Sequence, residues 1–158
     1  MDGTGTSDRS PELVFRLLED SHRRLVGERL VPVAGPVEVR TRWLYEDAPF
    51  GVLAHDGGDD PLFVYENRTA QRWFGYSWDA FVGMPSRRSA GPEAQEDRDR
   101  LLADVARDGW ADGYRGVRIA AGGRPFWVED VRMWNLLGDH GEYRGQAALL
   151  RRRRDVDP

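Results

Sequence analysis

Apolar residues recur at helical spacing near the start of the chain. The tripeptide Ser10-Pro11-Glu12 is typical of a helix start, because serine caps, proline suits the first helical position and an acid suits the first turn. Apolar positions then repeat at intervals of three and four residues as far as Leu25. This pattern predicts an amphipathic helix over residues 11–26, and a second helix over residues 37–46 follows a linker that contains proline and glycine.

Shorter apolar runs predict a hairpin that leads into a capped helix. Residues 50–55 and 62–66 form two strands, and the segment Asp56–Pro61 between them has turn composition. Asn67 then caps a helix that runs through Phe74. The remaining predicted elements are a helix at residues 93–107 and strands at residues 114–120, 126–136 and 145–150. This order suits a small sheet with helices folded across one face, which together enclose a pocket.

Length and charge limit the organisation and the partners. The 158 residues fit one domain. We divide the chain into a disordered N-terminus (1–9), a helical extension (10–47), the main domain (48–151) and a C-terminal tail (152–158). The net charge of −4 gives no general attraction to nucleic acid or to an anionic membrane, so we expect neither partner. No apolar signal region or membrane-spanning run occurs, which predicts a cytoplasmic protein.

Two motifs resemble the PAS domain family. The segment Asn67–Gly83 matches the helical part of that family, and Gly123–Val128 matches the beginning of its fourth strand. The residues of Trp43–Tyr45, Ala54–Asp56 and Pro85–Ala90 are similar to those of the MEKHLA branch of PAS domains. That branch is found in stand-alone bacterial proteins and in plant class III homeodomain–leucine-zipper regulators. The resemblance implies an α+β fold, with a five-stranded antiparallel sheet, helices across one face and two additional N-terminal helices. It also implies a sensory or regulatory role.

The spacing is also similar to that of the light-sensing LOV branch. In that alignment the reactive cysteine of LOV domains falls at Ser86, and an arginine that binds the flavin phosphate falls at Arg87. The amide side chains that read the flavin ring fall at Arg118, Val128 and Ala147. The resemblance implies a related pocket. The chain has no cysteine to form a photoadduct, and these side chains supply no amide contacts, so the residues argue against flavin; we do not expect heme either.

Strand alternation predicts which side chains enter the pocket. In the LOV register, one face of the fourth strand turns inward and carries Phe126, Val128, Asp130, Arg132 and Trp134. Arg118 lies on the matching face of the third strand. One aspartate does not neutralise two arginines, so an anionic ligand such as a carboxylate or a phosphate would supply the missing partner. Alternatively, Asp130 pairs with one arginine while the other reaches solvent, or a register slip of one residue turns both arginines to water.

Three functions remain open. The leading hypothesis is a small-molecule-binding sensory module that acts in trans, either on a partner protein or through its own dimer. The second is a small cofactor-independent enzyme in which Asp130, Arg118 and Arg132 act on an acidic substrate with help from His55 or Tyr45. The third is a ligand-free interaction or dimerisation domain with a packed core.

Other positions complete the set of expectations. No two histidines have metal-ligand spacing, so we expect no metal site. His55 is better explained as a surface or capping residue at the end of its strand than as a catalytic base. The N-terminal helices either cover the outer face of the sheet or pack on a second copy, and we expect Phe15 and Trp43 in that contact.

Overall fold

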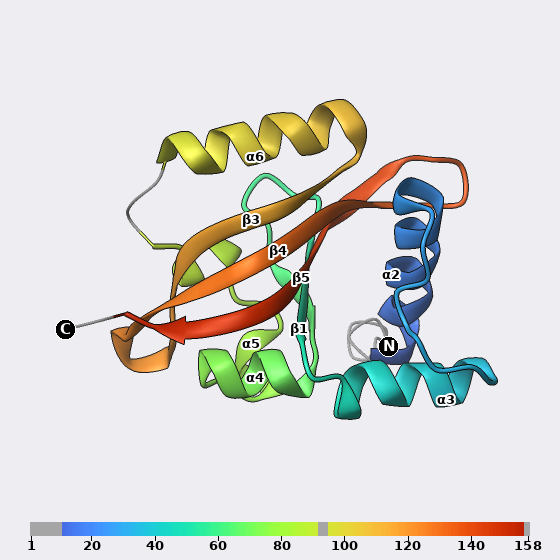
Figure 1. The fold of residues 1–158 in the computed structure, drawn as a ribbon, viewed down its shortest axis with the longest axis horizontal. Helices are drawn as coiled ribbons and strands as arrows, with labels where there is room; N and C mark the ends of the chain where they lie inside the picture. The colour runs from blue at the N-terminus through green and yellow to red at the C-terminus, as the bar shows by residue number, and fades with distance from the viewer. Residues whose placement is uncertain (1–10, 92–94, 157–158) are drawn as a thin grey trace, which may run out of the picture.

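A five-stranded antiparallel sheet with strand order β2-β1-β5-β4-β3 forms the centre of the protein (Figure 1). The structure is a computed structural model that describes residues 11–91 and 95–156. Its strands are β1 (Gly51–Asp56), β2 (Phe63–Glu66), β3 (Trp110–Ile119), β4 (Pro125–Leu137) and β5 (Tyr143–Asp155). Its longer helices are α2 (Pro11–Val26), α3 (Val37–Arg42), α4 (Arg68–Phe74), α5 (Trp78–Phe81) and α6 (Gln95–Asp108). The predicted fold class is confirmed.

Short helical turns complete the connections. A π-helical turn, η1 (Trp43–Asp47), continues α3, so the second predicted helix is present in two parts. The 3-10 turns η2 (Ser86–Ser89) and η3 (Ala121–Gly123) precede α6 and β4. The residues predicted as a C-terminal tail extend β5 as far as Asp155. The predicted disorder of residues 1–9 lies outside the described residues.

Asn67 holds four segments together at the start of α4. Its Oδ1 accepts hydrogen bonds from the backbone N–H groups of Ala70 and Val52, both at 3.0 Å. Its Nδ2 donates to the backbone carbonyls of Leu44 and Phe50, again at 3.0 Å. The predicted cap is therefore confirmed, and the same buried amide also fixes η1 against β1.

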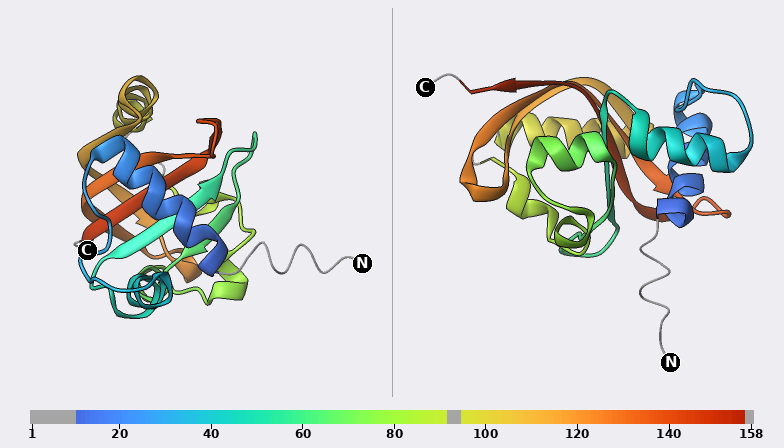
Figure 2. Two further views of the ribbon diagram at one scale, coloured as in Figure 1. Left: turned by 90° about the vertical axis from the view of Figure 1, so that its right-hand side faces the viewer. Right: turned by 90° about the horizontal axis from the view of Figure 1, so that it is seen from below.

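Two hydrophobic clusters lie on opposite faces of the sheet. Helices α4, α5 and α6 lie along one face, which curves around them to form a cup (Figure 2). The cluster on the cup side includes Phe74, Phe81, Phe126 and Val128. We call the other side the outer face.

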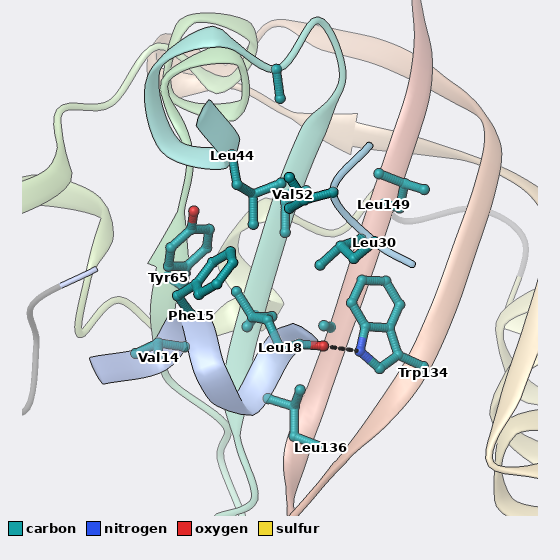
Figure 3. Packing of buried hydrophobic residues seen from close by; sticks show 14 residues of the cluster. Val14, Phe15, Leu18, Leu30, Leu44, Val52, Tyr65, Trp134, Leu136 and Leu149 are labelled. Carbon is teal, nitrogen blue, oxygen red and sulfur yellow. Dashed lines mark hydrogen bonds between the residues drawn. The ribbon is translucent and has the colours of Figure 1, made fainter. Parts of the chain in front are cut away.

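The N-terminal helix α2 packs on the outer face. Phe15 and Leu18 are fully buried there, and the indole Nε1 of Trp134 donates to the carbonyl of Leu18 at 3.3 Å (Figure 3). Trp43 is half-buried and lies edge-on to Phe50, with ring centroids 5.8 Å apart. We considered two arrangements for the N-terminal helices, and the burial of Phe15 corresponds to the one in which α2 covers the outer face of the sheet. A contact with a second copy stays a prediction.

Strand β4 does not keep one face to the cup along its length. Asp130 has a positive φ of 55°, which interrupts the alternation of side chains. Val128 and Val131, three residues apart, both belong to the cup-side cluster, whereas Trp134 belongs to the outer cluster. The predicted face that joins Phe126 and Val128 to Arg132 and Trp134 is therefore wrong beyond Asp130.

Within residues 11–91 and 95–156, no helix combines the length and the apolar character needed to cross a membrane.

Candidate functional site

A cavity of about 70 Å³ lies between the cup side of the sheet and the segments η2 and α6. Its apolar wall includes Leu53 and Phe63 from the hairpin, Leu101 from α6 and Met133 from β4. Its polar groups come from three strands and from η2: His55, Ser86, Ser89, Tyr114, Arg118 and Gln146. An apolar wall with a few convergent polar groups is the usual composition of a small-molecule site.

Hydrogen bonds fix the η2 wall of this cup cavity. The backbone N–H of Ser86 donates to the carbonyl of Pro61 at 2.9 Å, which ties η2 to the end of the hairpin turn. The hydroxyl of Ser89 donates to the carbonyl of Ser86 at 2.9 Å. Ala90 forms an isolated bridge with Arg118, so the chain after η2 also touches the edge strand β3. These contacts bring Ser86, Ser89 and Arg118 to one cavity although they are distant in sequence.

His55 lies at the β1 wall of the cavity and is bonded to its neighbour. Its Nδ1 donates to the carbonyl of Asp56 at 2.8 Å, because a carbonyl oxygen can only accept. The carboxylate of Asp56 instead accepts from the N–H groups of Gly58 (3.3 Å) and Leu62 (3.0 Å) and so closes the hairpin turn. The Asp56 carboxylate therefore stabilises the turn.

The predicted ligand-binding residues separate into three groups. Ser86 and Arg118 line the cup cavity. Val128 is fully buried on the cup side without lining the cavity, and Arg87 is exposed and pairs with Asp60 at 3.1 Å. The third group, Asp130, Arg132 and Trp134, is taken up in contacts with Arg151, with the loop after α2 and with α2 itself.

The constellation on which the enzyme hypothesis depends is not assembled. Arg118 and His55 lie at the cup cavity, but Arg132 points to the outer face because of the change of face at Asp130. Tyr45 also packs with the outer cluster, and its hydroxyl accepts a hydrogen bond from the Gln71 amide at 2.9 Å. Asp130 accepts from Arg151 at 3.3 Å, whereas the prediction places it between Arg118 and Arg132.

Sequence reasoning missed several polar residues that the fold brings to the cup side, among them Gln146 and Glu66. Gln146 lines the cavity, and its amide donates to Asn135 at 3.2 Å. Its alternation with the cup-side residues Ala148 and Leu150 on β5 was available as a signal. Glu66 is fully buried opposite Leu53 of the cup-side cluster, and none of the described residues forms a hydrogen bond with either carboxylate oxygen. Burial raises the pKa of Glu66 to about 9.

The cup cavity does not fit a flavin. A cavity of roughly 150 Å³ can hold a single benzene ring, and this one measures about 70 Å³. Ser86, Arg118 and Ala147 line it as the LOV alignment implies, but they offer neither a thiol nor the amide contacts. As for metals, no cluster of three or more histidine or acidic side chains in the described part of the chain is arranged to hold an ion.

Solved structures share this fold at low sequence identity. A PAS domain from Colwellia psychrerythraea matches with a TM-score of 0.62 and 16% identity, over 76% of this chain and 96% of that domain. The LOV domain of a blue-light-activated histidine kinase from Erythrobacter litoralis EL346 matches with a TM-score of 0.55 and 24% identity, over 70% of this chain and 99% of that domain. Among curated proteins, none matches the chain.

A third structural match corrects one expectation about partners. An RNA-binding light-oxygen-voltage receptor matches with a TM-score of 0.62 and 20% identity, over 82% of this chain and 37% of the receptor. Our exclusion of nucleic acid rested on net charge alone, and it is wrong as an exclusion, since a receptor that contains this fold binds RNA. Net charge describes the average of a surface and does not exclude a local site.

The sequence itself matches one family. The model of the MEKHLA domain matches residues 13–154, which covers most of α2, all of the sheet except the last residue of β5, and both walls of the cup cavity. Together with the PAS architecture, this match shows that the chain belongs to the MEKHLA domain family.

Proposed function

We propose that this MEKHLA domain is a sensory or regulatory module that binds a small anionic molecule in the cup cavity and acts on a partner in trans. The observation that carries the proposal is the cup cavity itself, where Arg118, His55 and Gln146 converge with two serines on an otherwise apolar wall. Such a wall excludes water and gives the few polar groups their selectivity.

The chemistry of the lining favours an anion of a few heavy atoms. Arg118 is the permanent positive charge of the lining, and a guanidinium binds a carboxylate or phosphate through two parallel hydrogen bonds. The hydroxyls of Ser86, Ser89 and Tyr114 and the amide of Gln146 supply further donors. The volume of about 70 Å³ restricts the ligand to a small molecule.

The cavity also distinguishes this proposal from a ligand-free packed core. In that alternative, large side chains from β4 fill the cup. Phe126 does pack there, but Arg132 and Trp134 are on the outer face, and the smaller side chains of Val131 and Met133 take the cup-side positions of β4. The cup cavity lies beside Met133 and Ala148.

Native mass spectrometry of the freshly purified protein tests the proposal. We expect a small non-covalent adduct on the wild-type protein, or uptake of one from a metabolite extract, and its loss in Arg118→Ala. Arg124→Ala is the matched control, because Arg124 is an exposed arginine in the turn before β4 and does not line the cavity. This variant should retain the adduct.

Two results would contradict the proposal. One is a bare protein mass for the wild type that persists after exposure to the metabolite extract. The other is an adduct that Arg118→Ala and the wild type retain equally, because the cup arginine would then have no part in binding. An absorbance spectrum recorded on the same sample checks the separate conclusion that the cup does not fit a flavin.

A further inference from the structure

A second cavity, of about 280 Å³, opens on the outer face of the sheet. Leu30, Pro49, Phe50 and Leu149 form its apolar wall, and Figure 3 shows Leu30 beside Leu149. Its polar residues come from the loop after α2, from α2 itself and from β4 and β5: His22, Glu28, Arg29, Arg132 and Arg151. Three arginines and one glutamate therefore line this outer cavity.

Arg132 is a buried guanidinium held in a fixed position. Its side chain is only 9% exposed, and its Nη2 donates to Asp112 at 2.8 Å. Its Nη1 donates to His22 Nε2 and to the Glu28 carboxylate, both at 3.2 Å. Its guanidinium carbon also lies over the ring of Trp110, 5.2 Å from the ring centroid. The Nε–H of Arg132 is buried and has no hydrogen-bond partner among the described residues.

His22 is neutral in this cluster. Its Nδ1 donates to the carbonyl of Glu28 at 3.0 Å, which leaves Nε2 to accept from Arg132. Burial lowers the pKa of His22, and the positive charge of Arg132 lowers it further. The histidine therefore orients the guanidinium without neutralising it.

The carboxylates that balance the arginines lie away from the cavity. Asp112 accepts from Arg132 and from Arg151, and Asp130 accepts from Arg151 at 3.3 Å, but neither aspartate lines the cavity. Burial raises the pKa of Asp112, but the hydrogen bonds from both arginines outweigh this and hold the pKa below its usual value. Among the residues that the structure describes, Glu28 is the only carboxylate that lines the outer cavity, and its side chain is 66% exposed.

We propose that the outer cavity is a second binding site, for a small organic anion whose carboxylate or phosphate group binds Arg132 and Arg151. The anion replaces Glu28 on Arg132, because a glutamate that is two-thirds exposed can turn into solvent at little cost. The apolar body of the ligand packs on Phe50 and Leu149. The site is separate from the cup cavity, because Arg118 lines only the other face of the sheet.

The position of this site gives it a regulatory consequence. Glu28, Arg29 and Leu30 belong to the loop after α2, whereas Arg132 and Arg151 belong to the centre of the sheet. A bound anion takes the place of Glu28 on Arg132 and so exchanges a contact of this loop for a contact of the ligand with the sheet. Because the anion binds the folded protein, binding should raise the melting temperature.

Isothermal titration calorimetry tests the site in a phosphate-free buffer of low ionic strength. Inorganic phosphate and benzoate serve as separate probes and distinguish a phosphate from a carboxylate with an apolar body. We expect the wild type to bind at least one of them and Arg151→Gln to bind it about tenfold more weakly, as expected for the loss of a charge-assisted hydrogen bond. Glu28→Gln should bind it more tightly, because the competing carboxylate is gone.

Two controls separate this site from general charge and from the cup. Arg107→Gln removes an exposed arginine of α6 that pairs with Asp104 and Asp108, and it should leave binding unchanged. The titrations are repeated in an Arg118→Ala background, which removes the anion-binding arginine of the cup cavity, so that the heat that remains and depends on Arg151 reports the outer cavity. Unchanged binding in folded Arg151→Gln would overturn the proposal, as would the absence of heat with both probes in the wild type. If Arg151→Gln is unfolded, Glu28→Gln decides: tighter binding supports the site, and equal or weaker binding refutes it.

Discussion

Glu66 shows how much one side chain can change the pH response of this domain. A carboxylate without a partner is costly to bury, and the side chain avoids this cost by keeping its proton. The neighbouring hydroxyl of Tyr65 is also buried without a partner among the described residues, so it does not supply the missing hydrogen bond. The neutral acid is therefore the form that the folded domain contains near neutral pH.

We expect Glu66→Gln to stabilise the protein increasingly as the pH rises. The pKa of Glu66 is about 9 in the folded protein, against an ordinary value of 4.5. Between these values the folded state holds a proton that the unfolded state has released, so the free energy of unfolding falls by about 1.4 kcal/mol per pH unit. Glutamine removes this term, since it is neutral at every pH and has nearly the shape of the protonated acid.

Urea unfolding at about pH 5 and about pH 8 measures this effect. The difference in unfolding free energy between Glu66→Gln and the wild type should be small at the lower pH and should grow toward the higher one. Glu46→Gln, at an exposed position of η1, is the control and should show no such growth. A difference that stays constant with pH would mean that Glu66 is ionised in the folded state.

At the scale of the element, β4 owes its two-sided role to Asp130. The positive φ of this residue sends Val128 to the cup and Arg132 to the outer face. L-residues occupy this left-handed region at a cost, and aspartate tolerates it better than most because its short side chain bonds locally. Here that side chain accepts a hydrogen bond from Arg151.

Two substitutions at Asp130 isolate the backbone contribution. Asp130→Gly and Asp130→Val both delete the carboxylate, but only glycine adopts the left-handed conformation freely. We expect the valine variant to be less stable than the glycine variant by about 2 kcal/mol, because a β-branched residue is strongly disfavoured there. Chemical denaturation of both variants provides the measurement. Equal stabilities would show that β4 can change face without the left-handed residue.

The elements that the sequence predicts well are those determined by local chemistry. The cap at Asn67 and the turn that begins at Asp56 both act within a few residues, and both are present. The face of Arg132 could not be predicted in the same way, because alternation assumes an uninterrupted strand and Asp130 gives no periodic signal. Burial of Glu66 was also hidden, since an acid at the end of a strand is normally exposed.

At the scale of the whole molecule, α2 is part of the core of the fold. Phe15 is fully buried among residues of the sheet, whereas Leu13 on the same helix is 55% exposed. Phe15→Ala should lower the free energy of unfolding by about 3–5 kcal/mol, and Leu13→Ala should change it by less than about 0.5 kcal/mol.

Urea unfolding at two protein concentrations distinguishes the core from an interface. If Phe15 acts within one chain, the loss of stability in Phe15→Ala is the same at both concentrations. A loss that depends on concentration would instead place Phe15 between two copies. A small loss at both concentrations would mean that α2 is not held against the sheet in solution.

Strand β5 contributes to the walls of both cavities, because two adjacent residues of it line different ones. Ala148 lines the cup cavity, and Leu149 lines the outer cavity. The sheet between the two cavities is one backbone thick, and packed side chains leave little slack to absorb a displacement. A molecule that pushes β5 outward to gain room in the cup therefore takes that room from the other side. The volumes of the two cavities are therefore linked through a single strand, and a larger or smaller side chain at Ala148 or Leu149 should change both volumes.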